Sequence, residues 1–177
     1  MRPTVALLLL SSTVLLADTA SSPAMKTACG PDQVKFSVKS VGLEPNLAQP
    51  DSGKALVYVI EEFDHAPNEI GRPTVRVGLD GVWTGANRGT SHFSFPVDPG
   101  ERHFCVDWQS RPFWLANTSP MIAASSLTAA AGQTYYLRAR IVQNSSSVWT
   151  LDFELVNPDE GRVLVAHSPR AEFHPKK

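Results

Sequence analysis

Three residues with catalytic or metal-binding side chains alternate along one short stretch of this chain. His103, Cys105 and Asp107 occupy every second position, and alternate residues of an extended strand face the same side of a sheet. Imidazole, thiolate and carboxylate are zinc ligands, and His92 could approach from a neighbouring strand. However, paired near-sequence ligands such as C-x-x-C or H-x-x-x-H are absent. The pattern therefore predicts no metal site here, and the sequence predicts no cofactor.

The same three-residue face suggests enzymatic hypotheses. A Cys105 thiolate beside His103 would be a nucleophile of the kind that thiol enzymes use. A serine combined with His65 or His103 and a carboxylate would resemble a hydrolytic triad, but no G-x-S-x-G elbow frames any serine. The sequence therefore predicts no catalytic residue.

Carboxylates gather at one strand end. Glu61, Glu62 and Asp64 lie within four positions, which is one way to supply the acid pair of a glycosidase. The simpler interpretation is a solvated strand end, and the separation of the carboxylates is not fixed by sequence.

The chain holds two cysteines, Cys29 and Cys105. In an exported protein such a pair is most simply a disulfide, for which chain entropy predicts about 4 to 5 kcal/mol of stabilisation. Strand alternation predicts that Cys105 faces away from the main core, so the bond would strap the N-terminal segment across the outside of a sheet. The alternative is a lipid-modified Cys29, although Lys26 stands where a leucine-like residue is expected.

Aromatic and basic residues suggest a binding surface. Trp83 follows a predicted turn, and Phe113 and Trp114 lie in a long connection, where binding residues often occur. Together with Arg88 and Arg111 they could form a platform for a sugar or a peptide. The alternative is that the aromatic rings cap the open ends of the domain.

The N-terminus predicts export. Arg2 precedes an apolar stretch over residues 5–17, which is too short to span a membrane but typical of a secretory signal peptide. A cut after Ala24, or nearer Ala20, would release a periplasmic or extracellular protein, or one lipid-anchored through Cys29. No later segment is apolar enough to be an integral membrane segment. The net charge of −1 offers no surface for nucleic acid.

Alternating apolar residues and frequent turn signals position these side chains on strands. Residues 53–62 are apolar on both faces, which indicates a central strand. The Asp80-Gly81, Gly89 and 98–100 turn signals within residues 76–108 predict a β-meander. The expected strands are residues 33–40, 53–62, 75–79, 93–97, 104–108, 134–142, 148–156 and 162–167. Alanine-rich residues 121–131 fit either a strand and turn or a short helix.

Eight or nine short strands indicate an all-β fold, a two-layer antiparallel β-sandwich of immunoglobulin or transthyretin type. A small closed barrel is the alternative. The expected organisation is a signal peptide (1–24), an N-terminal strand and linker (25–52), the sandwich (53–167, with strand 33–40 joined to it) and a frayed polar tail (168–177).

Four motifs resemble a known family. They are GKALVYVIEE from residue 53, RVGLDGVWTGA from 76, SHFSFPVDPGERHFCVDWQS from 91 and AGQTYYLRAR from 131. Their order resembles the bacterial domain-of-unknown-function family 2846, over Gly53 to about Val156. The resemblance implies an exported β-sandwich, often a lipoprotein, with no established activity or catalytic residues.

The sequence thus predicts an exported bacterial protein that serves as a non-enzymatic binding or structural module of the cell envelope. Its partner would be an envelope protein or a glycan of unknown identity. The alternative function is a secreted hydrolase or thiol-dependent enzyme that uses the face of His103, Cys105 and Asp107.

Overall fold

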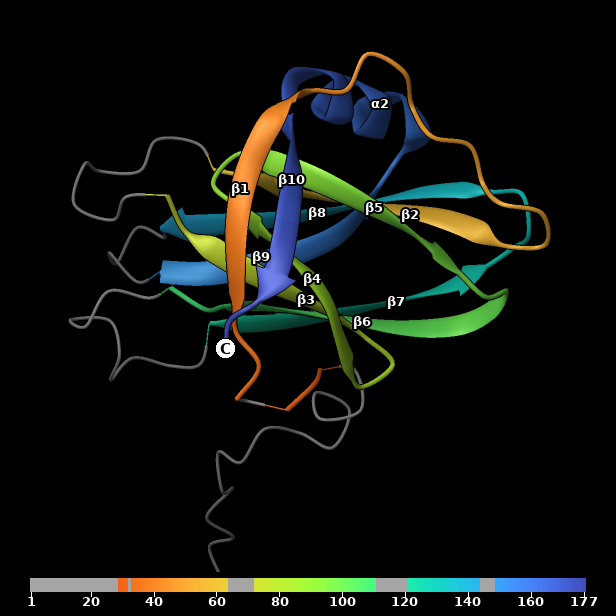
Figure 1. Cartoon of the computed structure of the whole chain (residues 1–177). Helices are drawn as coiled ribbons and strands as arrows, with labels where there is room; N and C mark the ends of the chain where they lie inside the picture. The colour runs from red at the N-terminus through yellow and green to blue at the C-terminus, as the bar shows by residue number, and fades with distance from the viewer. Residues whose placement is uncertain (1–28, 32, 64–71, 111–120, 144–148) are drawn as a thin grey trace, which may run out of the picture.

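The computed structural model describes residues 29–31, 33–63, 72–110, 121–143 and 149–177, which form ten strands and one helix. The strands lie in two sheets, ordered β1-β10-β5-β2-β8-β9 and β4-β3-β6-β7 (Figure 1). The predicted all-β sandwich is confirmed, with more strands than expected. The elements are β1 (Phe36–Leu43), β2 (Ala55–Glu62), β3 (Thr74–Leu79), β4 (Val82–Arg88), β5 (Ser91–Val97), β6 (Gly100–Trp108), β7 (Ile122–Ala129), β8 (Thr134–Gln143), β9 (Trp149–Val156), α2 (Pro158–His167) and β10 (Pro169–Pro175).

β2 is the central strand that its two apolar faces predict. It pairs antiparallel with β5 and parallel with β8, so the sandwich is not purely antiparallel as expected. One face of β2 joins the core between the sheets through Ala55, Val57 and Val59. The other face, with Leu56, Tyr58 and Ile60, packs with Val165 of α2. Because both faces of β2 are covered, polar and apolar residues do not alternate along this strand.

Residues 76–108 do not form a simple meander. β3 and β4 form a hairpin around Asp80-Gly81, where both residues have positive φ. β5 then crosses to the larger sheet to pair with β2, and β6 returns to pair with β3. The sequence did not predict β4, which contains Gly85. A side chain at Gly85 would clash with the rings of Phe93 and Phe173, so close packing requires the glycine.

The C-terminal predictions were wrong. Residues 162–167 lie in a helix instead of a strand, and the tail expected to fray forms β10, paired antiparallel with β1. The helix begins at an Asn157 cap, whose side chain accepts hydrogen bonds from the amides of Asp159 and Glu160. Pro158 and these two acids in the first turn add to the helix signal. This local capping, together with burial of Val165, overrides the strand preference of the valines.

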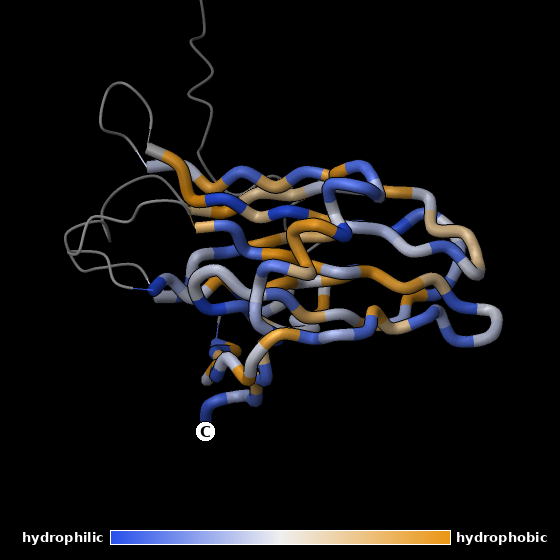
Figure 2. The backbone as a smooth tube through the Cα atoms, turned by 90° about the horizontal axis from the view of Figure 1, so that it is seen from above, coloured by the Kyte–Doolittle hydropathy of each residue, from blue (hydrophilic) through white to orange (hydrophobic). Residues whose placement is uncertain are grey.

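The remaining strands are close to their predicted bounds. The alanine-rich stretch becomes β7, so the strand alternative was correct there. In β9, Leu151 and Phe153 are buried as expected, but Leu155 is 50% exposed because β9 is an edge strand. Figure 2 shows polar and apolar segments mixed along the strands, as a two-layer sandwich requires. Within the described ranges, no helix has the length and hydropathy to cross a membrane.

β1 and β10 close one side of the sandwich (Figure 1). β10 meets β5 at a single parallel pair, Arg170 with His92, and then diverges from it. Pro96 lies further along β5, and its missing N–H is tolerated where a strand edge is unpaired. The divergence of the two strands creates an open groove between them.

Candidate functional site

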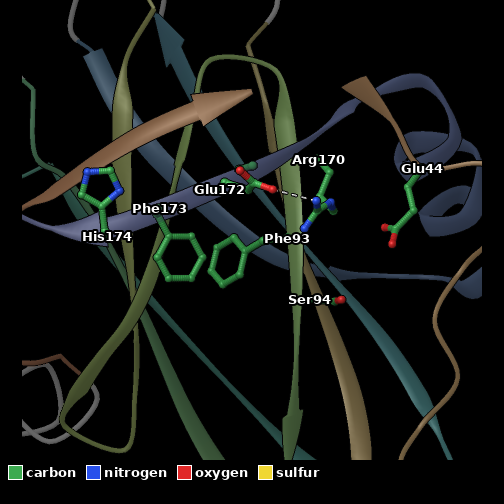
Figure 3. Close-up of a pocket in the computed structure, with 8 residues that line it drawn as sticks. Glu44, Phe93, Ser94, Arg170, Glu172, Phe173 and His174 are labelled. Carbon is green, nitrogen blue, oxygen red and sulfur yellow. Dashed lines mark hydrogen bonds and ion pairs between the residues drawn. The ribbon is translucent and has the colours of Figure 1, made fainter. Parts of the chain in front are cut away.

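The groove between β5 and β10, here called the β5–β10 groove, is a cavity of about 510 Å³. This volume lies in the range of small-molecule sites. Figure 3 shows its lining, with Glu44 and His174 at opposite sides of the view and two aromatic rings between them. The lining residues are Glu44, Phe93, Ser94, Arg170, Ala171, Glu172, Phe173 and His174.

The groove has an apolar floor and a charged rim. The rings of Phe93 and Phe173 meet edge to face with their centroids 4.9 Å apart, a geometry favoured between aromatic rings. On the rim, the guanidinium of Arg170 lies 2.9 Å from the carboxylate of Glu172. This ion pair leaves Glu44 as the lining carboxylate without an arginine or lysine partner among the described residues.

The buried side chain of His92 contacts Glu44 and orients its carboxylate. His92 is fully buried, with Nδ1 2.9 Å from Ser168 Oγ and Nε2 3.2 Å from Glu44 Oε2. Burial lowers the pKa of His92, although the Glu44 carboxylate acts in the opposite direction. The ring is therefore neutral at neutral pH. A neutral ring can orient the Glu44 carboxylate but cannot cancel its charge.

Ser168, His92 and Glu44 contain the residue types of a hydrolytic triad, but the geometry does not make Ser168 a nucleophile. Ser168 is 1% exposed and is absent from the groove lining. Its hydroxyl lies 2.9 Å from the carbonyl of Leu164 at the end of α2. The hydroxyl has one proton, which it donates either to this carbonyl or to Nδ1 of the neutral His92 ring, and a substrate in the groove would not reach it.

The predicted disulfide is present. Cys29 and Cys105 are bonded, with their Cα atoms 5.1 Å apart. Cys105 is nevertheless fully buried and belongs to the main core cluster, which corrects the expectation that it faces away from that core. Strand alternation does turn Cys105 away from Phe104 and Val106, but the N-terminal segment covers this side of the sheet.

The other two residues of this face, Asp107 and His103, do not join Cys105 in a site. Asp107 forms an ion pair with Arg76, whose Nη2 lies 2.6 Å from Oδ2. The backbone amide of His103 donates to Asp80. Among the described residues, no three histidine, cysteine or acidic side chains gather closely enough to hold a metal ion.

Trp83 is 8% exposed and forms part of the seal over the disulfide. Its Nε1 donates to the carbonyl of Pro31 at 2.7 Å, and the guanidinium carbon of Arg76 lies 4.2 Å from the ring centroid. It therefore offers no exposed platform, and it packs over the face of the smaller sheet instead of capping an open end of the domain. Of the other predicted binding residues, Arg88 is exposed at the opposite end of β4. Arg111, Phe113 and Trp114 lie outside the described residues.

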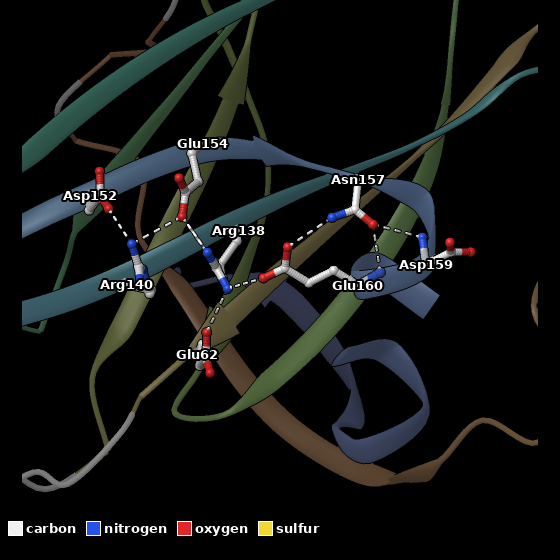
Figure 4. A network of polar contacts seen from close by, with 8 residues as sticks. All are labelled: Glu62, Arg138, Arg140, Asp152, Glu154, Asn157, Asp159 and Glu160. Carbon is white, nitrogen blue, oxygen red and sulfur yellow. Dashed lines mark hydrogen bonds and ion pairs between the residues drawn. The ribbon is translucent and has the colours of Figure 1, made fainter. Parts of the chain in front are cut away.

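The carboxylates of the predicted cluster point to different environments. Glu62 faces an ionic network centred on Arg138, whereas Glu61 is fully buried in the sandwich. Asp64 lies outside the described residues. Figure 4 shows Arg138 between three acids, of which Glu154 and Glu160 lie 2.5 and 2.6 Å from its nitrogens. Since neighbours on a strand face opposite sides, Glu61 and Glu62 do not form a glycosidase pair.

The signal for the β5–β10 groove was weak in the sequence. Its rim comes from a tail that was expected to fray, and Glu44 comes from a stretch predicted to be a loop. His92 was noted only as a distant metal ligand. No protein-family model, curated protein or solved structure matches this chain, and the resemblance to family 2846 stays a prediction.

Proposed function

We propose that this protein is a non-enzymatic binding module of a bacterial cell envelope and that the β5–β10 groove is its ligand site. The observation that carries the proposal is one oriented carboxylate, Glu44, beside an aromatic floor in an open cavity of about 510 Å³. The signal-peptide pattern, the disulfide and the resemblance to family 2846 support the envelope setting.

The chemistry of the groove favours a ligand that carries an amine next to an apolar group. Phe173 supplies apolar contact area, because its ring is only partly buried and packs on the buried Phe93 ring, and Glu44 supplies a negative charge that the neutral His92 ring leaves in place. Arg170 and Glu172 already neutralise each other. An envelope peptide that presents an amine beside aliphatic or aromatic carbon would meet these requirements.

The test uses two probes of opposite charge. The disulfide-bonded protein, labelled with ¹⁵N, is titrated with 2-phenylethylamine and separately with 3-phenylpropanoate, which have the same ring and a similar chain. The amine should shift the amide resonances of Glu44, Ser94 and β10, and the carboxylate probe should not. Glu44→Gln should weaken amine binding by about tenfold, as expected when one charge-assisted contact is removed.

Glu101→Gln is the matched control, because Glu101 is an exposed carboxylate on β6 away from the groove. It should bind the amine as the wild type does. Equal binding of both probes, or unchanged binding by Glu44→Gln, would contradict the assignment of the groove.

A further inference from the structure

A second groove, here called the β1–β3 groove, has a different electrostatic character. It is a cavity of about 230 Å³ that β1, the start of β3, the ends of β4 and β6 and the C-terminal tail line together. Arg72, Arg88 and Lys176 come to it from three separate segments. No acidic side chain is among its described lining residues, so the described lining of the groove carries a positive charge.

The two arginines differ from the rest of the described chain. The structure describes eight arginines, and six of them have a carboxylate partner within 4.0 Å. These six are Arg76, Arg102, Arg138, Arg140, Arg162 and Arg170. The other two, Arg72 and Arg88, have none among the described residues, and both line this groove. Within the described part of the chain, the two arginines without a carboxylate partner thus lie at one place.

The backbone brings these two arginines together. Gly89 has a φ of +61°, and a side chain there would come within 3.2 Å of the Arg72 stem. Its amide donates to the carbonyl of Pro73 at 2.8 Å, which ties the end of β4 to the start of β3. Arg88 at the end of β4 and Arg72, two residues before β3, flank this contact and are therefore held close together.

A hydroxyl donor lies in the same groove. Ser110 Oγ accepts hydrogen bonds from the Thr74 amide at 2.6 Å and from Trp108 Nε1 at 3.3 Å. A serine hydroxyl has two acceptor positions and one proton. Since both acceptor positions are occupied, its proton is available to an acceptor outside these two partners. An oxyanion bound between the arginines would be such an acceptor.

The side chain of Gln109 fixes one wall of the groove, because it makes the two backbone hydrogen bonds that a neighbouring strand would make. Gln109 Oε1 accepts from the amide of Phe36 at 2.6 Å, and its Nε2 donates to the carbonyl of the same residue at 2.8 Å. These bonds engage both the oxygen and the nitrogen of the Gln109 side-chain amide, and they hold β1 against the end of β6. The groove is therefore organised before any ligand arrives, which lowers the entropic cost of binding.

We propose that the β1–β3 groove binds a phosphate group, either free or as an ester of an envelope component. Guanidinium forks bind phosphate oxygens in pairs, and cations from three segments suit a tetrahedral group with several terminal oxygens better than a planar carboxylate. This site does not depend on the β5–β10 groove, because the two cavities share no lining residue.

Isothermal titration of the full disulfide-bonded protein tests the proposal with three probes: inorganic phosphate, glycerol 3-phosphate and acetate, at constant ionic strength. Phosphate should bind with a dissociation constant of about 1 mM or tighter, and acetate should bind at least tenfold more weakly. Tighter binding of glycerol 3-phosphate would identify an ester as the source, and equal binding would identify the phosphate group alone.

The variants Arg72→Gln and Arg88→Gln should each weaken phosphate binding by about tenfold. Both should keep the wild-type melting temperature, since neither guanidinium has a carboxylate partner among the described residues. Arg162→Gln, on α2, is the matched control and should bind phosphate normally, as should Glu44→Gln. Absence of saturable phosphate binding, equal binding of acetate, or equal loss in Arg162→Gln would overturn the proposal.

Discussion

At the scale of single residues, Glu61 is a carboxyl side chain buried in an unfavourable, apolar environment. It follows Val57 and Val59 on the core face of β2 and is fully buried. Among the described residues, neither carboxylate oxygen has a hydrogen-bond partner, and Asn87 Oδ1 also lacks one. Burial raises the pKa of Glu61 well above its ordinary value of 4.5. The folded protein therefore keeps the proton on Glu61 at pH values at which an exposed glutamate would lose it.

This raised pKa predicts a loss of stability as the pH rises. Below pH 4.5 the side chain is protonated in both the folded and the unfolded chain and adds no pH dependence. Above it the unfolded chain releases the proton and the folded chain keeps it, so the free energy of unfolding falls until the folded pKa is passed. Glu61→Gln, measured by urea unfolding at pH 5 and pH 8, should reduce this fall and be more stable than the wild type at pH 8.

Glu62→Gln is the matched control for that measurement, since Glu62 is half-buried beside Arg138. It should retain the wild-type decline between the two pH values. A Glu61→Gln protein that declines as steeply as the wild type would show that Glu61 does not cause the effect.

At the scale of elements, the segment of residues 29–31 acts as a strap on the outer face of the smaller sheet. Three contacts hold it: the bond from Cys29 to Cys105, the close packing of Gly30 on the Trp83 ring, and the hydrogen bond from Trp83 to Pro31. The strap buries side chains that would otherwise be exposed on this face. It converts the outside of a sheet into part of the core.

Replacing both cysteines by alanine should lower the free energy of unfolding by about 2 to 5 kcal/mol, because the unfolded chain loses a cross-link between distant residues. The same variant should show red-shifted tryptophan emission as the Trp83 ring becomes exposed. Urea denaturation followed by fluorescence measures both effects.

Trp83→Phe separates the two contributions to the strap. It keeps the disulfide and removes the hydrogen bond to Pro31, so it should cost about 1 kcal/mol. If the double cysteine variant has the same unfolding midpoint as the wild type, the strap does not stabilise the fold.

At the scale of the whole molecule, the C-terminal strand completes the sandwich. β10 pairs with β1 along six positions and touches β5 at one. Its Phe173 ring lies 5.7 Å from that of Phe36 and 4.9 Å from that of Phe93. The first and last described strands therefore depend on each other and on the chain between them. Both proposed grooves also lie along this pair of strands.

Truncation after Ser168 should prevent folding, because β1 would lose β10, its one partner among the described strands, and Phe93 would lose Phe173. The expected result is loss of near-ultraviolet circular dichroism and rapid proteolysis. Removal of Lys177 alone is the control and should leave both properties unchanged. Phe173→Ala tests the same closure in an intact chain and should cost about 2 to 3 kcal/mol. A truncated protein that resists proteolysis as the wild type does would refute this role.

The sequence by itself determined the all-β class, most strand positions and the disulfide partners. These follow from local or compositional rules: side-chain alternation, turn residues and a pair of cysteines behind a predicted export signal. It also held the helix signal at Asn157-Pro158, which the prediction of a strand over residues 162–167 overlooked. Family membership and function stay predictions.

Only the tertiary structure decided which strands pair across long distances and which polar side chains are buried. The alternation of side chains along a strand predicts which side of β2 Glu61 faces and which side of β6 Cys105 faces. It does not predict what covers that side. The grooves arise because Glu44, His92 and Arg170, and likewise Arg72, Arg88 and Lys176, come from segments far apart in the chain. Their proximity depends on pairing between strands that are distant in sequence. The local pattern of residue types does not reveal this pairing.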